Sequence, residues 1–243
     1  MKIVAISDVH VKIPGDDAYH LLCSFLTHPT VAKSDYILLL GDIFDLMCGP
    51  HVAYLENFGP IFDLMDELIK KGKKVYFFEG NHDVHLEKLL KKRWPNSEII
   101  LSQVPIVEKI DGKEYYFSHG DEHEVENLNY QKYKSLILSA PLKFVANYLM
   151  PYSVLNYLGN RASKNSKKRG SKSFDENLIK QVFRDGVTKK TLGKHDFILG
   201  GHSHVQDIFS ISPTSVYINN GYALKSKTFL MINNHEISFE SLT

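Results

Sequence analysis

Short apolar runs alternate with amphipathic stretches over the first hundred residues of this chain. Lys2–Ser7, Tyr36–Leu40 and Lys74–Phe78 are nearly continuous apolar runs rich in β-branched or aromatic residues, which is typical of buried strands. Between them, Asp16–Thr27 and Pro60–Lys71 repeat apolar residues at intervals of three and four, the period of a helix with one buried face. The pattern therefore predicts an α/β fold that begins with alternating strands and helices.

The second half of the chain predicts further helices and a hairpin. Val84–Lys92 has the pattern of a short helix, and Pro105–Ile110 and Glu114–Phe117 flank Asp111-Gly112, which predicts a hairpin with a type I′ turn. The remaining predicted elements are a helix over Phe174–Leu192 and strands over Phe197–Leu199, Ser215–Ile218 and Thr228–Glu240.

A segment of different character, residues 122–173, interrupts this order. It is rich in Tyr and Leu, is helical in pattern, and ends in a basic run. Between residues 135 and 160 the only charged side chain is Lys143, but Pro141 and Pro151 break the run, so a membrane-spanning helix is not expected. We expect a helical lid, either a buried helical pair or one that dips into a membrane surface.

Composition narrows the class of protein. A length of 243 residues and an apolar content of 43% suit one large domain, residues 1–243, with the lid as an insertion. The net charge of +1 gives no general attraction to nucleic acid. Two cysteines, Cys23 and Cys48, favour neither a disulfide framework nor a zinc clip, and the first residues lack the apolar region of a signal peptide. We expect a cytoplasmic protein.

Five islands of Asp, His and Asn carry the chemistry of the chain, and nearly every one follows a predicted strand. Strand ends that lie side by side form a pocket, and such side chains offer oxygen and imidazole donors to divalent metal ions. The islands read Asp8-Val9-His10, Gly41-Asp42-Ile43-Phe44-Asp45, Gly80-Asn81-His82-Asp83, His119-Gly120-Asp121 and Gly201-His202-Ser203-His204.

Seven donors are too many for one tetrahedral ion but suit two ions that share a carboxylate. They are Asp8, His10, Asp42, Asn81, His119, His202 and His204. Their mixture of imidazole and oxygen without thiolate favours Mn²⁺, Fe or Zn²⁺ over Ca²⁺. Two ions so held can clamp a phosphate and lower the pKa of a bridging water. Each island alone is commonly structural, but five in order predict a hydrolytic two-metal centre.

Neighbouring residues have predicted supporting roles. Asp8 and His10 are two apart, so on an ideal strand they point to the same side. His82 follows Asn81 and is a candidate proton donor to the leaving oxygen, oriented by Asp83 or Asp45. The glycines at strand ends allow sharp turns and the close approach of phosphate; they are Gly41, Gly80, Gly120, Gly200 and Gly201.

The ordered motifs DVH, GDIFD, GNHD, HGD and GHSH resemble the calcineurin-like metallophosphoesterase superfamily over residues 8–204. The resemblance implies four layers, with two mixed β-sheets flanked by helices. It also implies that His82 assists phosphoryl transfer. The implied ligands are Asp8, His10, Asp42 and His204 for one ion, and Asp42, Asn81, His119 and His202 for the other.

The insertion is similar to a narrower family, the UDP-2,3-diacylglucosamine hydrolases of lipid A synthesis, which release 2,3-diacylglucosamine 1-phosphate and UMP, usually with Mn²⁺. The similarity lies in Tyr130-Gln131-Lys132-Tyr133-Lys134, Arg161-Ala162-Ser163-Lys164-Asn165-Ser166 and Ser171-Lys172-Ser173. It implies lid helices that hold acyl chains. The substrate contacts we infer are Asn127, Tyr130, Arg161, Asn165, Lys167, Lys172, Asp45 and Asp83. This chain departs from the best-known members at His82, where they carry Arg, and at Asn127, where they carry an acid.

The basic run itself suits an anionic partner. Six Lys and Arg residues lie within residues 161–172 without an acid, so the run can neutralise a diphosphate or the headgroups of an anionic membrane. A solvated loop is the simpler interpretation. Nucleic acid is not expected, because the aromatic neighbours lie in an apolar context. The alternatives for function are a soluble phosphodiesterase or phosphoprotein phosphatase of the same superfamily, and a metal-dependent binding module without catalysis.

Overall fold

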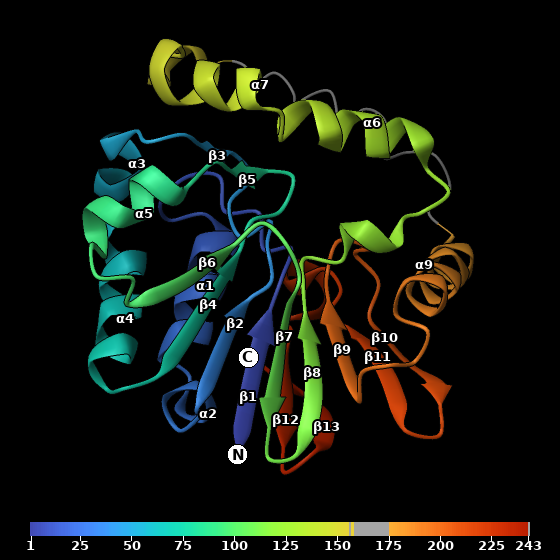
Figure 1. Ribbon diagram of the computed structural model, residues 1–243. Coiled ribbons are helices and arrows are strands. Elements are labelled where there is room, and N and C mark those ends of the chain that lie inside the picture. The colour runs from blue at the N-terminus through green and yellow to red at the C-terminus, as the bar shows by residue number, and fades with distance from the viewer. Residues whose placement is uncertain (156, 158–174, 243) are drawn as a thin grey trace.

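The computed structural model describes residues 1–155, 157 and 175–242, and its core contains two large β-sheets packed face to face (Figure 1). The first sheet has the strand order β13-β12-β1-β2-β4-β6. Its strands are β1 (Lys2–Ile6), β2 (Tyr36–Leu39), β4 (Lys74–Phe78), β6 (Ile99–Ser102), β12 (Thr228–Asn233) and β13 (Glu236–Ser241). Strands β1, β2, β4 and β6 are parallel, and Ile6 lies opposite Leu39, which lies opposite Phe77. The carboxyl ends of these strands therefore reach the same edge.

The second sheet has the strand order β10-β11-β9-β8-β7. Its strands are β7 (Ile106–Ile110), β8 (Lys113–Phe117), β9 (Phe197–Gly200), β10 (Asp207–Ser212) and β11 (Ser215–Asn219). The central three, β8, β9 and β11, are parallel, whereas β7 and β10 pair antiparallel at the edges. A small parallel pair, β3 (Met47–Cys48) and β5 (Asp83–Val84), lies near the carboxyl edge of the first sheet (Figure 1).

Burial on both faces explains the continuous apolar runs of the central strands. On β1, Val4 and Ile6 face the helices, while Ile3 and Ala5 face the second sheet. The outer face of the first sheet is covered by helices, among them α1 (Asp17–Thr27), α4 (Gly59–Lys70) and α5 (Glu87–Arg93). Shorter helices complete that side: α2 (Pro29–Ala32), α3 (Val52–Asn57) and α10 (Ala223–Ser226).

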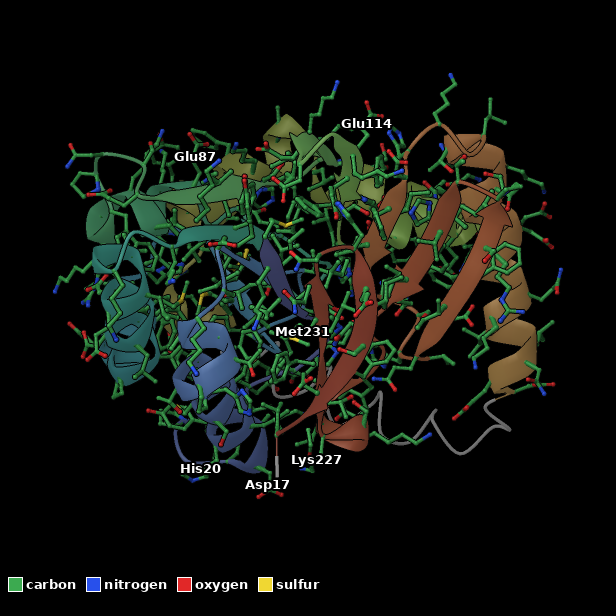
Figure 2. All side chains as sticks on the ribbon, turned by 90° about the horizontal axis from the view of Figure 1, so that it is seen from below. Asp17, His20, Glu87, Glu114, Lys227 and Met231 are labelled. Atoms are coloured by element: carbon green, nitrogen blue, oxygen red, sulfur yellow. The ribbon has the colours of Figure 1, made fainter. Side chains whose placement is uncertain are left out.

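Helix α9 (Glu176–Thr191) covers the far face of the second sheet. Phe183 and Val187 pack there against Ile198 and Tyr217. Figure 2, seen from below, shows α1 and α4 on one side of the molecule and α9 on the other, with the sheets between them. The predicted four-layer α/β fold is therefore confirmed.

The helical segment that follows the second sheet lies across the carboxyl ends of the strands (Figure 1). It begins with the short helix η1 (Asp121–His123) and continues with α6 (Leu128–Ile137), α7 (Ala140–Phe144) and η2 (Val145–Leu149). Neither α6 nor α7 has a buried residue, so the expected buried helical pair is wrong for this part. Within the described chain, every helix is too short or too polar to cross a membrane.

Most predicted elements are found, and the differences have local causes. The hairpin is confirmed, because Asp111 and Gly112 have φ values of 48° and 79°, as a type I′ turn requires. The helix predicted from Val84 begins only at Glu87, because Val84 pairs in β5 and His85 has a φ of 60°. The sequence pattern did not indicate β3, β5, β6, β10 and α3, which are short or lie at an edge.

Gly186 allows α9 to pack directly against the backbone of η1. A Cβ added at Gly186 would lie 1.7 Å from the carbonyl oxygen of His123, whereas a Cβ at Gly59 would meet nothing within 4 Å. We expect Gly186→Ala to lower the free energy of unfolding by about 1–3 kcal/mol or more, as overpacking does. Gly59→Ala should change it by less than about 0.5 kcal/mol. Urea denaturation of both variants tests this, and equal stability would contradict the backbone contact.

Candidate metal centre

The seven candidate donors lie in loops just beyond the carboxyl ends of the strands. Asp8 and His10 follow β1, Asp42 follows β2, and Asn81 follows β4. From the second sheet, His119 follows β8, and His202 and His204 follow β9. Loops from both sheets therefore supply the site.

Five of these donors have a left-handed backbone. The φ values are 51° at Asp8, 56° at His10, 52° at Asp42, 67° at His202 and 59° at His204. The strand alternation proposed for Asp8 and His10 is therefore the wrong reason for their proximity, since β1 ends at Ile6. Tight turns bring the side chains together instead, and Asp and His tolerate this conformation better than most residues.

The first group of donors comprises Asp8, His10, Asp42 and His204, whose candidate ligand atoms all lie within 4.8 Å of one another. The Nε2 atoms of His10 and His204 are 3.2 Å apart. His204 Nε2 lies 3.3 Å from Asp8 Oδ1, and His10 Nε2 lies 3.9 Å from Asp42 Oδ2. Nitrogen and oxygen lone pairs thus converge on one small volume.

The second group shares Asp42 with the first. Candidate ligand atoms of Asp42, His119 and His202 also lie within 4.8 Å of one another. His119 Nε2 is 3.9 Å from Asp42 Oδ1 and 3.4 Å from the amide oxygen of Asn81. The structure therefore brings all seven predicted donors into two adjoining groups, and this donor set fits two divalent cations.

Further hydrogen bonds select which imidazole nitrogen faces the centre. His119 donates from Nδ1 to the carbonyl oxygen of Leu40 at 2.8 Å, so Nε2 points to the donors. His202 Nε2 lies 3.2 Å from Glu124 Oε2, which leaves Nδ1 for a metal ion. A carbonyl or carboxylate behind a histidine ligand is the usual means of fixing its tautomer and orientation.

Asp83 holds two of the donor loops together. Its buried carboxylate accepts hydrogen bonds from the backbone N–H groups of Asp42, Ile43, Phe44 and Gly80 at 2.7–3.3 Å. We inferred a substrate contact for Asp83, but its side chain is fully enclosed and is used in this bracing. It acts on the loops rather than on a ligand.

Gly80, which precedes Asn81, must be a glycine because the protein itself fills the space that a side chain would need. A Cβ at Gly80 would lie 2.1 Å from Asp42 Oδ1. That same oxygen accepts the backbone N–H groups of Asn81 and His82 at 2.8 and 2.9 Å. The expected open space for phosphate is therefore occupied here by the shared aspartate itself.

Charge and burial set the protonation of the donors in the metal-free protein. Burial would raise the pKa of Asp8, but the hydrogen bond and charge of His204 outweigh it and lower the pKa. Burial lowers the pKa of His10 to about 4. Burial also opposes a charge on His119, yet Asp42, Asp121 and Asp8 raise its pKa to about 9. The pKa of Asp42 is also lowered, so Asp8 and Asp42 are held ionised and attract cations.

His82 and Asp45 lie at the mouth of the first group. His82 Nδ1 lies 2.8 Å from the carbonyl oxygen of Asp45, and the His82 ring lies 4.8 Å from the His10 ring, centroid to centroid. The Asp45 carboxylate is 3.8 Å from His10 Nδ1 and 3.5 Å from Lys12 Nζ. His10 Nδ1 is itself buried without a hydrogen bond, and the Asp45 carboxylate faces it at 3.8 Å.

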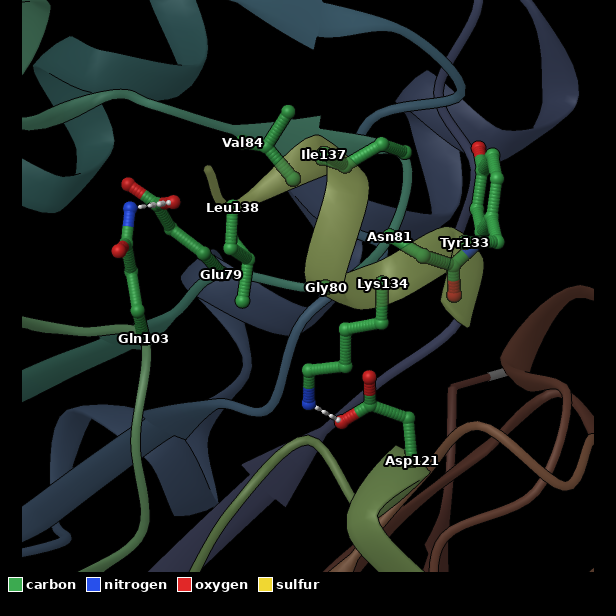
Figure 3. Close-up of a pocket in the computed structure, with 10 residues that line it drawn as sticks. All are labelled: Glu79, Gly80, Asn81, Val84, Gln103, Asp121, Tyr133, Lys134, Ile137 and Leu138. Carbon is green, nitrogen blue, oxygen red and sulfur yellow. Dashed lines mark hydrogen bonds and ion pairs between the residues drawn. The ribbon is translucent and has the colours of Figure 1, made fainter. Parts of the chain in front are cut away.

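Helix α6 is fastened near the second group through Asp121, and Figure 3 shows the contact between Asp121 and Lys134. Asp121 accepts hydrogen bonds from Tyr130 Oη at 2.8 Å and from Lys134 Nζ at 2.6 Å. The Tyr130 ring lies 5.0 Å from the His202 ring, centroid to centroid. A small crevice lined by Asn81, Tyr133 and Lys134 remains beneath the helix.

Apart from Asp83, the inferred substrate contacts divide into three sets. Asn127 caps α6 by accepting the N–H of Tyr130 at 3.0 Å, and it donates to Glu124 at 2.8 Å, so both ends of its amide are used within the protein. Tyr130 and Asp45 line the centre. The other four lie outside the described residues: Arg161, Asn165, Lys167 and Lys172.

Three residues near the donors were not found from the sequence. Glu124 supports His202, Asp121 anchors α6, and Tyr222 stacks on His204 with ring centroids 5.3 Å apart. Asp121 lies in the island His119-Gly120-Asp121, so its place two residues after a predicted ligand could have indicated a role near the centre. Nothing in the sequence pattern marked Tyr222, which reaches the site from the loop before α10.

This fold and donor arrangement define a metal-dependent phosphoesterase, and comparison with known proteins agrees. The chain belongs to the Calcineurin-like phosphoesterase family, which matches residues 1–206. The resemblance inferred from the motifs is thereby confirmed, and the chain is a hydrolase of this family.

Similar proteins share a narrower name. UDP-2,3-diacylglucosamine hydrolase of Wigglesworthia glossinidia brevipalpis is 25% identical over 240 residues, covering 96% of this chain and 91% of the relative. The protein of that name from Shewanella loihica is 24% identical, covering 98% and 95%. That from Aliivibrio fischeri is 23% identical, covering 90% and 86%.

Solved structures show the same fold. A dimetal phosphatase from Danio rerio has a TM-score of 0.51 at 12% identity, covering all of this chain and 96% of the other. A novel archaeal phosphodiesterase has a TM-score of 0.50 at 14% identity, covering 99% and 98%. At this identity the likeness concerns architecture alone.

Asp45 should strengthen metal binding by orienting His10. We expect Asp45→Ala to weaken Mn²⁺ affinity about 10–100-fold, the usual effect of removing a group behind a histidine ligand. Asp185→Asn, on the exposed face of α9, is the control and should bind as the wild type does. Calorimetric titration of metal-free protein provides the measurement, and an unchanged affinity in Asp45→Ala would exclude this role.

Metal affinity should rise with pH. His119 must be neutral to bind a cation, and its pKa of about 9 in the metal-free protein means that a proton competes below that value. Asp8 stays ionised because its pKa is lowered, so it does not reverse the trend. We expect apparent affinity to increase about tenfold per pH unit for each displaced proton between pH 6 and 9. Calorimetry in buffers of different ionisation enthalpy should show proton release, and a flat profile would contradict it.

Proposed function

We propose that this chain hydrolyses the pyrophosphate of a nucleotide-linked lipid, UDP-2,3-diacylglucosamine, to 2,3-diacylglucosamine 1-phosphate and UMP. The observation that carries the proposal is the position of the donor cluster beneath α6, which continues into the exposed apolar residues of α7 and η2. The names of the relatives support the same substrate, since they match nearly the whole chain.

The apolar segment is suited to acyl chains or to a lipid surface. Phe144, Tyr148 and Leu149 on α7 and η2 are 54–64% exposed, and Leu136 on α6 is 62% exposed. A contiguous exposed apolar patch commonly marks a binding surface. We infer that residues 122–173 act as a lid that receives the acyl chains, and that this face rests on the anionic inner surface of the cytoplasmic membrane.

The assignment of ligands follows the two donor groups. Asp8, His10, Asp42 and His204 would hold one divalent ion, and Asp42, Asn81, His119 and His202 the second. Mn²⁺ suits this mixture of oxygen and imidazole, with Fe or Zn²⁺ as alternatives. When bound, the pair would polarise a phosphate and supply a nucleophilic water.

His82 is positioned to deliver a proton. Its Nδ1 donates to the carbonyl of Asp45, so Nε2 is directed away from that carbonyl. The side chain is 40% exposed at the mouth of the site, within reach of a substrate oxygen. We assign it the protonation of the departing phosphate oxygen. Lys12 and Asp45 complete the polar rim, and the basic residues Arg161, Lys167 and Lys172, with Asn165, are proposed to meet the diphosphate.

The alternative functions explain less of the structure. A soluble phosphodiesterase or phosphoprotein phosphatase would share the donor groups but gives no role to the exposed apolar face of α7 and η2. A binding module without catalysis gives no role to His82, which lies beside a full set of candidate ligands.

Purified protein loaded with Mn²⁺ should release UMP from UDP-2,3-diacylglucosamine in detergent micelles. We expect His82→Gln to lower kcat about 10²–10⁴-fold while metal content stays unchanged, because general acid catalysis is worth that much. Asp8→Ala should abolish turnover through loss of metal.

Product analysis by mass spectrometry and metal analysis of each variant provide the measurements. Wild-type protein that turns over bis(p-nitrophenyl) phosphate but releases no UMP would exclude the lipid substrate. Wild-type protein inactive on both, with metal bound, would favour the binding module.

A further inference from the structure

A groove of about 390 Å³ adjoins the first donor group at His204. Its inner wall is formed by His204 and by Tyr222, whose ring stacks on the His204 imidazole. Lys180 from α9 and Lys225 from α10 form its outer wall. The volume lies within the range of about 300–1,000 Å³ that is typical of ligand pockets.

The two flanks of the centre differ in chemistry. On the side of the second donor group, α6 and its Tyr130 cover His202 and lead to the apolar segment. On the side of the first group, His204 opens into the groove, where the two lysines stand beside Glu176. A substrate whose phosphate lies between the groups therefore extends toward an apolar surface at one end and a basic groove at the other.

In-line displacement reinforces this division. The attacking water and the leaving oxygen lie on opposite sides of the reacting phosphorus, and the half that stays bonded occupies an equatorial position, so the two halves of a diphosphate extend from the phosphorus in different directions. The acyl-bearing half is matched by the apolar segment. The polar half of the substrate is then matched by the groove bounded by His204 and Tyr222.

We propose that this groove binds the nucleoside monophosphate half of the substrate. The aromatic ring of Tyr222 contacts the ribose or base, and Lys180 and Lys225 attract the phosphate. Lys225 lies 2.7 Å from Glu176, so a nucleotide phosphate competes with that carboxylate for it. The choice of nucleotide rests on the function proposed above, whereas the groove and its charges do not.

Binding of UMP to the Mn²⁺-loaded full chain tests the groove without turnover. We expect Tyr222→Ala and Lys180→Ala each to weaken UMP affinity at least tenfold by calorimetric titration, and Tyr222→Phe to restore most of it. Inorganic phosphate, which lacks the nucleoside, should bind Tyr222→Ala within about twofold of wild type. Lys190→Ala, on the same helix but outside the groove, serves as the matched control and should bind UMP normally.

The outcomes separate this inference from the proposed substrate. Groove variants that bind UMP with the wild-type affinity would overturn the groove. An equal loss of affinity for UMP and for phosphate in Tyr222→Ala would also overturn it, because the effect would then lie at the metal ligands. UMP binding that depends on Tyr222, with no hydrolysis of the lipid, would retain the groove and exclude the substrate. Hydrolysis of the lipid by the wild type, with an unchanged KM for that lipid in both groove variants, would retain the proposed substrate and exclude the groove.

Discussion

The buried carboxylate of Asp83 is the constraint on which the centre depends. Four backbone N–H groups from two loops converge on it, and those loops carry Asp42 and Asn81. Asp42 in turn accepts two N–H groups from the second loop. Burial and the charge of Asp42 raise the pKa of Asp83 to about 8. Because its hydrogen bonds are enclosed, removing Asp83 would leave several donors buried and unpaired. Asp42 can therefore serve both donor groups only because Asp83 holds the backbone of the loop that carries it.

Holding the donors in place has a conformational cost. Left-handed backbone at a residue other than glycine costs on the order of 1–3 kcal/mol, and five of the seven donors have it. Two apolar layers, one between the sheets and one under α1 and α4, hold the strand ends from which these turns emerge. The rigid parallel strands thus allow strained loops to persist at one edge, where their side chains meet.

Sequence patterns predicted the fold and indicated the seven residues that the structure brings together, because both leave local marks. Buried strands such as Lys2–Ile6 are continuous apolar runs, and each donor follows a strand with little chain between. The supporting contacts left no such mark. Asp83 and Asn127 look like surface ligands in the sequence, yet their partners are backbone groups whose positions depend on the folded loops. Tyr222 reaches His204 from a loop that no motif identifies.

The chemistry of the surroundings decides what a metal centre of this type acts on. The donor groups alone would serve almost any phosphoester, because they recognise only the phosphate. Selectivity must come from the surfaces that diverge from them, since contacts to the non-reacting parts of a substrate position the bond that breaks. Here one surface is exposed and apolar and the other is a basic groove beside an aromatic ring. The proposed substrate, with a lipid at one end and a nucleotide at the other, would contact both surfaces at once, whereas a small soluble phosphoester would contact neither.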